Sequence, residues 1–211
     1  MGIVLNGLLG GFSGKVGPVI GCRYKGKTYL RSLPGKRKNP PSELQLAQQV
    51  KFGMMCAFNA DMQALFWHTF DAVGKTAEKS KIAFGQNLKY AVMGEYPDLH
   101  IDFRKVVLSK GLLHNVVELS ATAAGGKIQF NWHDNNGEGL TRNDDETILV
   151  AYCPENKETL FRIGTALRED EVAELDVSAY KGQTLHTWII FRSRNCKYIS
   201  ISVYTGAFVV E

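Results

Sequence analysis

Residues 127–134 read KIQFNWHD, and their alternation decides the fold class. Ile128, Phe130 and Trp132 fall on one side of an extended chain, because successive side chains of a strand point to opposite faces. A strand with one apolar and one polar face is typical of an antiparallel sheet that covers a core on one side. This stretch therefore predicts a core strand of a β-sandwich.

Six other stretches in residues 113–211 share this character. They are short, rich in β-branched and aromatic residues, and bounded by turn residues such as N-N-G-E-G. Together they predict an immunoglobulin- or fibronectin-like antiparallel β-sandwich without a disulfide. The seven predicted strands are 116–122, 127–132, 147–153, 159–164, 173–177, 184–192 and 198–205.

Residues 42–112 predict a central pair of helices. Two prolines before Ser42 prevent an earlier start, and Gln45 stands in the capping-box position. Apolar residues then recur at three- and four-residue steps as far as Leu65, with a break expected just after Phe58. A second helix is predicted over 76–92, and a short strand over 103–109.

Residues 1–41 form the third part of this predicted α+β chain. Residues 1–17 are rich in glycine, so we expect an arm with weak local structure that depends on a partner surface for order. Residues 18–33 predict a β-hairpin with a tight turn at K-G-K, and 34–41 a basic, proline-broken linker.

Charge is unevenly divided along the chain. Residues 1–42 hold eight Lys and Arg and no acidic residue, whereas the remaining 169 hold 17 basic and all 21 acidic residues. A basic segment before an acidic body indicates contact with a polyanion or with an acidic protein surface. The candidate partner-binding residues are Phe12, Lys15, Arg23, Lys25, Lys27, Arg31, Lys36, Arg37 and Lys38.

Residues 21–28, GCRYKGKT, match the phosphate-binding pattern G-x-x-x-x-G-K-[ST]. That loop works only where a helix begins at its Lys-Thr pair, because the helix N-terminus and the loop N–H groups hold the phosphates. The residues after Lys27 are β-prone and run into Pro34, so no helix is expected there. The pattern is therefore interpreted as part of the hairpin.

No other motif predicts catalysis, and we expect no enzyme, cofactor or metal site. The acidic cluster at 144–146 has the oxygen ligands that calcium prefers but lacks the EF-hand order, so a solvated loop is expected, as for 169–171. The four cysteines are far apart in sequence, which predicts reduced and mostly buried thiols. Neither a signal peptide nor a membrane span is expected, which places the chain in the cytoplasm or in a particle.

Several runs resemble a family of uncharacterised proteins of similar length from Bacteroidota and their mobile elements. The most specific is G-G-F-S-G-K-V-G at 10–17; others are N-P-P-S-E-L-Q-L-A-Q-Q-V-K-F at 39–52, L-K-Y-A-V-M-G-E-Y-P at 88–97, V-V-L-S-K-G at 106–111 and S-V-Y-T-G at 202–206. The family has no assigned activity, so the resemblance implies no catalytic residue.

Two kinds of function follow as expectations. The first is a non-enzymatic structural protein of a phage-like or related particle, which docks on other protein subunits through its N-terminal arm. The alternative is a nucleic-acid-binding accessory protein that uses the basic segment 15–38, where tyrosines are interleaved with lysines and arginines.

Overall fold

The chain forms two compact units in its computed structural model, Met1–Ser42 and Glu43–Glu211. The first division follows the predicted linker, whereas the predicted boundary at 112/113 is a change of secondary structure inside the second unit. The structure describes residues 3–4, 12–35, 39–70 and 76–211.

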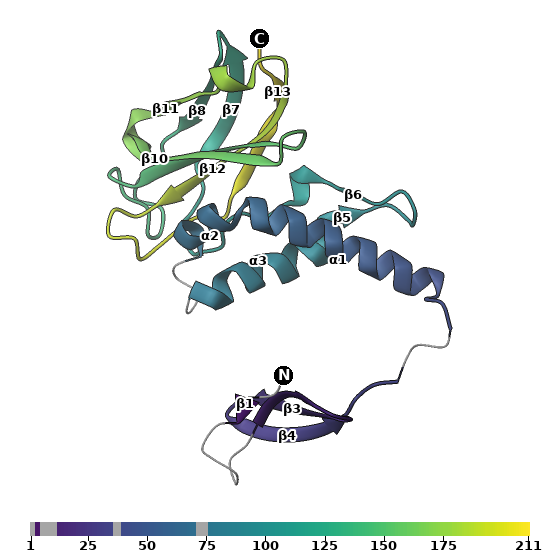
Figure 1. Cartoon of the computed structure of the whole chain (residues 1–211). Helices are drawn as coiled ribbons and strands as arrows, with labels where there is room; N and C mark the ends of the chain where they lie inside the picture. The colour runs from purple at the N-terminus through teal and green to yellow at the C-terminus, as the bar shows by residue number, and fades with distance from the viewer. Residues whose placement is uncertain (1–2, 5–11, 36–38, 71–75) are drawn as a thin grey trace. The chain divides into compact units, whose positions relative to one another are not determined.

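Among its described residues, the N-terminal unit contains four antiparallel strands in the order β1-β2-β3-β4, of which Figure 1 labels β1, β3 and β4. Lys25 and Gly26 form the two-residue turn between β3 and β4, with φ of 48° and 79°, and this turn geometry matches the twist of the strands. The predicted hairpin is therefore present. The strands are β1 (Ile3–Val4), β2 (Phe12–Val16), β3 (Val19–Tyr24) and β4 (Lys27–Ser32).

The structure corrects the prediction for the glycine-rich arm. Weak local structure was predicted for residues 1–17, but Phe12–Val16 form a strand that pairs with β3, for example through Gly14 opposite Gly21. The chain thus supplies a partner strand of its own, because the backbone hydrogen bonds of β3 fix a segment whose glycines would otherwise leave it mobile. Residues 1–2 and 5–11 lie outside the described residues.

Seven antiparallel strands in the second unit form two sheets (Figure 1). The first, second and fifth strands make one sheet, in the order β11-β8-β7, and the other four make the second, in the order β10-β9-β12-β13. This is the predicted immunoglobulin/fibronectin-like β-sandwich. The strands are β7 (Val117–Ala124), β8 (Lys127–His133), β9 (Glu146–Cys153), β10 (Glu158–Leu167), β11 (Val172–Asp176), β12 (Thr184–Arg192) and β13 (Val203–Val209).

The core between the two sheets is built on the alternation in β8. Ile128, Phe130 and Trp132 are buried there, in one cluster with Leu149 and Phe191 of the facing sheet. The rings of Trp132 and Phe191 meet edge to face, with their centroids 5.4 Å apart. The periodicity of this one strand therefore predicted its buried face correctly.

Helices cover the other face of the four-stranded sheet. Trp188 and Ile190 of β12 share a buried cluster with Phe58 and Leu65 of the helices. Because helices and the second sheet bury this sheet on both sides, β9 is buried at seven consecutive positions and reads as a continuous apolar run. The helices are α1 (Glu43–Asp61), α2 (Gln63–Thr69) and α3 (Thr76–Tyr90).

The described residues thus contain three α-helices, where the sequence predicted a pair with an interrupted first member. The break falls at Met62 rather than just after Phe58. Thr159 of β10 marks this point, because its hydroxyl donates a hydrogen bond of 2.9 Å to the carbonyl of Asp61. A strand of the sandwich therefore supplies the hydrogen-bond donor for the last carbonyl of α1, and this contributes to ending the helix there.

The strand predicted over 103–109 is wrong. A short 3-10 helix, η1 (Phe103–Lys105), begins this segment, and a side chain then takes the place of a partner strand. Asn87 of α3 donates from Nδ2 to the carbonyl of Val107 (3.0 Å) and accepts from the Val107 N–H at Oδ1 (2.8 Å). The segment follows a small hairpin of β5 (Val92–Met93) and β6 (His100–Ile101).

The last strand is shifted from the predicted 198–205 to Val203–Val209. Ser200 bonds to β12 outside the regular ladder: its N–H donates to the carbonyl of Phe191 (2.8 Å) and its hydroxyl accepts from the Phe191 N–H (2.9 Å). Across the residues that the structure describes, no helix combines the length and apolar character that a membrane crossing requires.

Candidate functional site

The N-terminal sheet has two faces of different chemistry, and the strand register assigns its residues to them. Lys15 lies opposite Ile20, Ile20 lies opposite Arg31, and Cys22 lies opposite Tyr29. Residues directly opposite on antiparallel strands share a face, so these side chains lie together. The basic face, as we call it, consists of Lys15, Ile20, Cys22, Tyr24, Lys27, Tyr29 and Arg31.

The other face of this sheet carries four large apolar side chains among those that the structure describes. Gly21 lies opposite both Gly14 and Leu30, and the ring of Phe12 reaches across to Gly21. This surface is called the apolar face below; its apolar side chains are Phe12, Val16, Val19 and Leu30, and Arg23, Thr28 and Ser32 lie on the same side.

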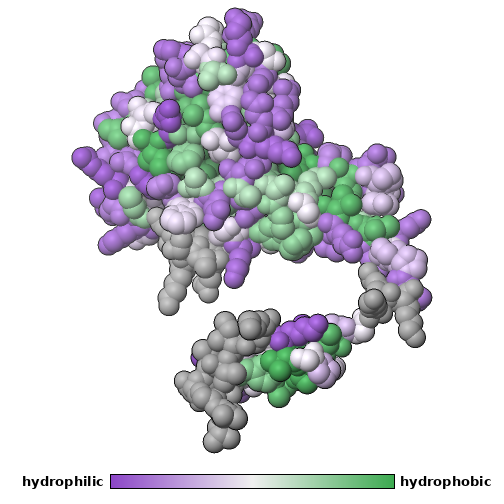
Figure 2. All heavy atoms as spheres, in the orientation of Figure 1, coloured by the Kyte–Doolittle hydropathy of each residue, from purple (hydrophilic) through white to green (hydrophobic). Residues whose placement is uncertain are grey.

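Both faces are largely exposed within the described residues. All six residues of β4 are exposed, including Leu30 at 61% and Tyr29 at 50%. Figure 2 shows hydrophobic residues at the surface of the described part of this unit. A sheet normally buries one face against a second layer, so exposed apolar side chains on a sheet of this size mark a contact surface.

The structure separates the nine predicted partner-binding residues into groups. Lys15, Lys27 and Arg31 lie on the basic face, whereas Phe12 and Arg23 lie on the opposite side. Lys25 lies in the turn, with its ammonium 5.5 Å from the centroid of the Tyr24 ring. The remaining three, Lys36, Arg37 and Lys38, lie outside the described residues.

The GCRYKGKT segment is part of the hairpin. Lys27 and Thr28 begin strand β4, not a helix. Their N–H groups therefore belong to a sheet, and the segment lacks the helix N-terminus that a phosphate loop uses. Gly26 provides the turn with positive φ, as the sequence indicated.

Gly21 offers a test of this sheet. A Cβ at Gly21 would collide with the backbone carbonyl and the ring of Phe12, so we expect Gly21→Ala to destabilise the pairing of β2 with β3 by about 1–3 kcal/mol. Amide hydrogen exchange of β2 and β3 measures this loss. Gly35→Ala is the matched control, because its added methyl meets nothing within 4 Å. Equal protection in both variants would contradict the packing of Phe12 on Gly21.

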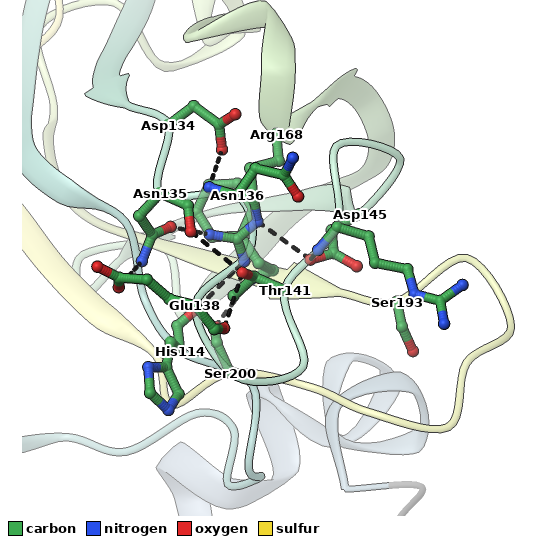
Figure 3. Close-up of polar contacts among 12 residues, drawn as sticks. His114, Asp134, Asn135, Asn136, Glu138, Thr141, Asp145, Arg168, Ser193 and Ser200 are labelled. Atoms are coloured by element: carbon green, nitrogen blue, oxygen red, sulfur yellow. Dashed lines mark hydrogen bonds and ion pairs between the residues drawn. The ribbon is translucent and has the colours of Figure 1, made fainter.

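A buried arginine that the sequence analysis missed organises one end of the sandwich. Arg168 is fully buried and begins η2 (Arg168–Asp170). Its Nε lies 3.0 Å from Oδ2 of Asp145, Nη1 donates to Oδ1 of Asn135 (2.6 Å), and Nη2 donates to the carbonyl of His114 (3.1 Å). Figure 3 shows the guanidinium at the centre of these three partners.

Two aromatic residues also contact Arg168. The guanidinium carbon of Arg168 lies 4.5 Å from the centroid of the Phe191 ring, and Trp132 Nε1 donates to the Arg168 carbonyl (2.8 Å). Burial lowers the pKa of Arg168, and the charge of Asp145 opposes that effect. Alternation along β10 did not single it out, because Arg162 and Gly164, which have the same parity as Arg168, are exposed.

The network contradicts part of the predicted solvated acidic loop at 144–146. Asp145 is fully buried in its ion pair with Arg168, and Glu146 lies 2.7 Å from Nη2 of Arg192. The second prediction holds, since residues 169–171 are exposed. Local charge alone did not show which carboxylate had a buried cation as its partner.

Two loops at this end carry exposed carboxylates. Hydrogen bonds join them: the Glu169 N–H donates to the carbonyl of Asn143 (3.4 Å), and the Asp134 N–H donates to Oε1 of Glu171 (2.9 Å). We call them the acidic loops, residues 134–145 and 168–171. Their partly or fully exposed carboxylates are Asp134, Glu138, Asp144, Glu169, Asp170 and Glu171.

A hollow of 380 Å³ lies between residues 139–145 and residues 193–198, lined in part by Arg142, Asp144 and Arg194. Among the described residues, no group of three or more His, Cys, Asp or Glu side chains could hold a metal ion.

All four cysteines are free, but the prediction of mostly buried thiols is wrong. Cys153 is buried and Cys22 is partly buried, whereas Cys56 and Cys196 are exposed.

Comparisons with known proteins complete the description. No curated protein matches the chain. Among solved structures, the fibronectin domains FN1–FN3 of chicken CNTN1 are similar at 7% identity and a TM-score of 0.38, over 49% of this chain. The chain covers one third (33%) of that solved chain. A protein-family match extends over residues 11–206, almost the whole sequence, and the chain therefore belongs to DUF6266, a family of unknown function.

Proposed function

We propose that this protein is a non-enzymatic structural protein of a multi-subunit assembly, and that it docks on another protein subunit through its N-terminal sheet. The observation that carries the proposal is the exposed apolar face. Leu30 is 61% exposed and Val16 is 51% exposed, on a sheet whose other side is basic and aromatic.

Burial of this face favours association. Covering a valine or leucine side chain contributes on the order of 1.5–3 kcal/mol, and the strands hold Val16 and Leu30 at fixed positions. A partner protein with an apolar surface fits the apolar face, because exposed apolar patches mark protein–protein contacts. The resemblance to mobile-element proteins supports a phage-like particle as the setting.

The test is sedimentation in an extract of the native host. We expect the wild-type protein to sediment with a large particle and Leu30→Asp to move into the low-mass fractions, because a charge cannot be buried against an apolar partner without a counter-charge. Leu112→Asp is the matched control, since Leu112 is 75% exposed in the second unit. Low-mass sedimentation of the wild type, or no difference between the two variants, would reject the proposal.

Nucleic-acid binding is the second candidate, and the basic face favours it. Tyr24 and Tyr29 lie on this face with Lys15, Lys27 and Arg31. Such a surface stacks bases on aromatic rings and contacts phosphates with its cations. This candidate predicts oligonucleotide binding that weakens steeply with salt and is lost in Tyr29→Ala.

A further inference from the structure

We infer that the basic face of the N-terminal sheet binds the acidic loops of a second copy of this chain, which produces a head-to-tail assembly. The inference goes beyond the proposed docking function. It assigns the occupant of the basic face, whereas the proposed function depends on the apolar face on the opposite side of the sheet.

Charge complementarity within one sequence is the first argument. The N-terminal segment carries eight basic residues and no acidic residue, and the remainder of the chain carries an excess of four acidic residues. Every copy therefore brings both a basic and an acidic surface, and the two attract each other between copies. Because both surfaces belong to the same chain, they are always present at equal concentration.

The acidic loops localise the negative charge on the second unit. Apart from the ion-paired Asp145 and Arg168, these two fully described loops carry six carboxylates against one cation, Arg142. Arg194 and Lys197 belong to the β12–β13 loop, and Arg194 lines the far side of the 380 Å³ hollow. The receiving surface is thus the side formed by residues 134–145 and 168–171.

The buried network makes this surface rigid. Arg168 ties Asn135, His114 and Asp145 together (Figure 3), and the loop-to-loop bonds described above join the two loops to each other. A rigid charged surface loses little conformational entropy when a partner binds.

The geometry sets the kind of assembly. The basic face and the acidic loops are different surfaces in different units, so the contact is heterologous. A heterologous contact forms a ring when the rotation closes and a filament when it does not. Both outcomes suit a structural protein of a particle.

Charge reversal tests the inference in purified protein by sedimentation velocity. The sheet variant carries Lys27→Glu and Arg31→Glu, and the loop variant carries Asp144→Lys and Glu169→Lys. Within the described part of the chain, neither the Asp144 nor the Glu169 carboxylate makes a side-chain hydrogen bond or ion pair, so we expect these changes to leave the fold intact. We expect wild-type protein to self-associate at low salt, and each variant alone to associate at least about tenfold more weakly.

Mixing the two variants gives the decisive result. In the mixture, the native sheet of the loop variant meets the native loops of the sheet variant, so we expect association to return. High salt should weaken both the wild type and the mixture, because the Debye length falls from about 10 Å at 0.1 M to about 3 Å at 1 M. Unfolded variants could not restore each other.

The other outcomes overturn the inference. These are a wild type that stays monomeric at every concentration, self-association that survives both reversals, a mixture that stays dissociated, and association that nuclease abolishes. The last result would assign the basic face to nucleic acid. Host-particle sedimentation that depends on Leu30 while the purified chain stays monomeric would leave the proposed function standing and reject only this inference.

Discussion

Replacing Arg168 by alanine is expected to lower the free energy of unfolding of the second unit by about 3–5 kcal/mol. The change removes the cation that neutralises fully buried Asp145, and it leaves an uncompensated charge in the interior. It also removes hydrogen bonds to Asn135 and His114 and the contact with the Phe191 ring. Breaking one member of a buried pair costs more than the pair itself contributes, because the remaining ion stays desolvated.

Denaturant unfolding measures this effect, and Arg162→Ala is the matched control. Arg162 lies on the same strand, β10, but is exposed, so its removal should change the stability by less than about 0.5 kcal/mol. The double variant Arg168→Met, Asp145→Leu should recover part of the loss, because it leaves no buried charge. Equal small effects of Arg168→Ala and Arg162→Ala would show that the ion pair is not buried in solution.

The sandwich strands were predictable because their signal is local. Alternation in residues 127–133 shows which side chains face the core, and it needs no knowledge of the partner strand. The prediction of a strand over 103–109 failed because the deciding contact is distant in sequence. The apolar residues of this segment are β-prone, but the side chain of Asn87, 20 residues away, bonds to its backbone in place of a strand.

The candidate site was likewise predictable only where its signal is local. Composition predicted a basic segment, but not which of its residues lie together. That depends on register, and a slip of one residue would exchange Lys27 and Thr28 between the two faces. Arg168 was missed because its partners Asp145 and Asn135 are 23 and 33 residues distant in sequence. Such pairs become visible only when the loops of the sandwich are placed.

The helical layer and the four-stranded sheet share one buried cluster, and Trp188 lies in it. This side chain is fully buried, with its ring centroid 5.4 Å from that of Tyr204 and 6.4 Å from that of Phe103. Phe58 of α1 and Leu65 of α2 belong to the same buried cluster. We expect Trp188→Ala to cost about 3–5 kcal/mol, because it leaves a cavity between the helices and the four-stranded sheet.

Two comparison variants and two probes make the result specific. Trp67→Ala should have little effect, because Trp67 is 55% exposed on α2. Trp188→Phe should cost less than Trp188→Ala, since it fills part of the space and removes an indole N–H that has no partner in the described structure. Far-ultraviolet circular dichroism follows the helices, and fluorescence of Trp132 follows the sandwich in a Trp67→Phe, Trp188→Ala background. Coincident transitions are expected if one core joins both layers, whereas earlier loss of the helical signal would show that the helices unfold separately from the sandwich.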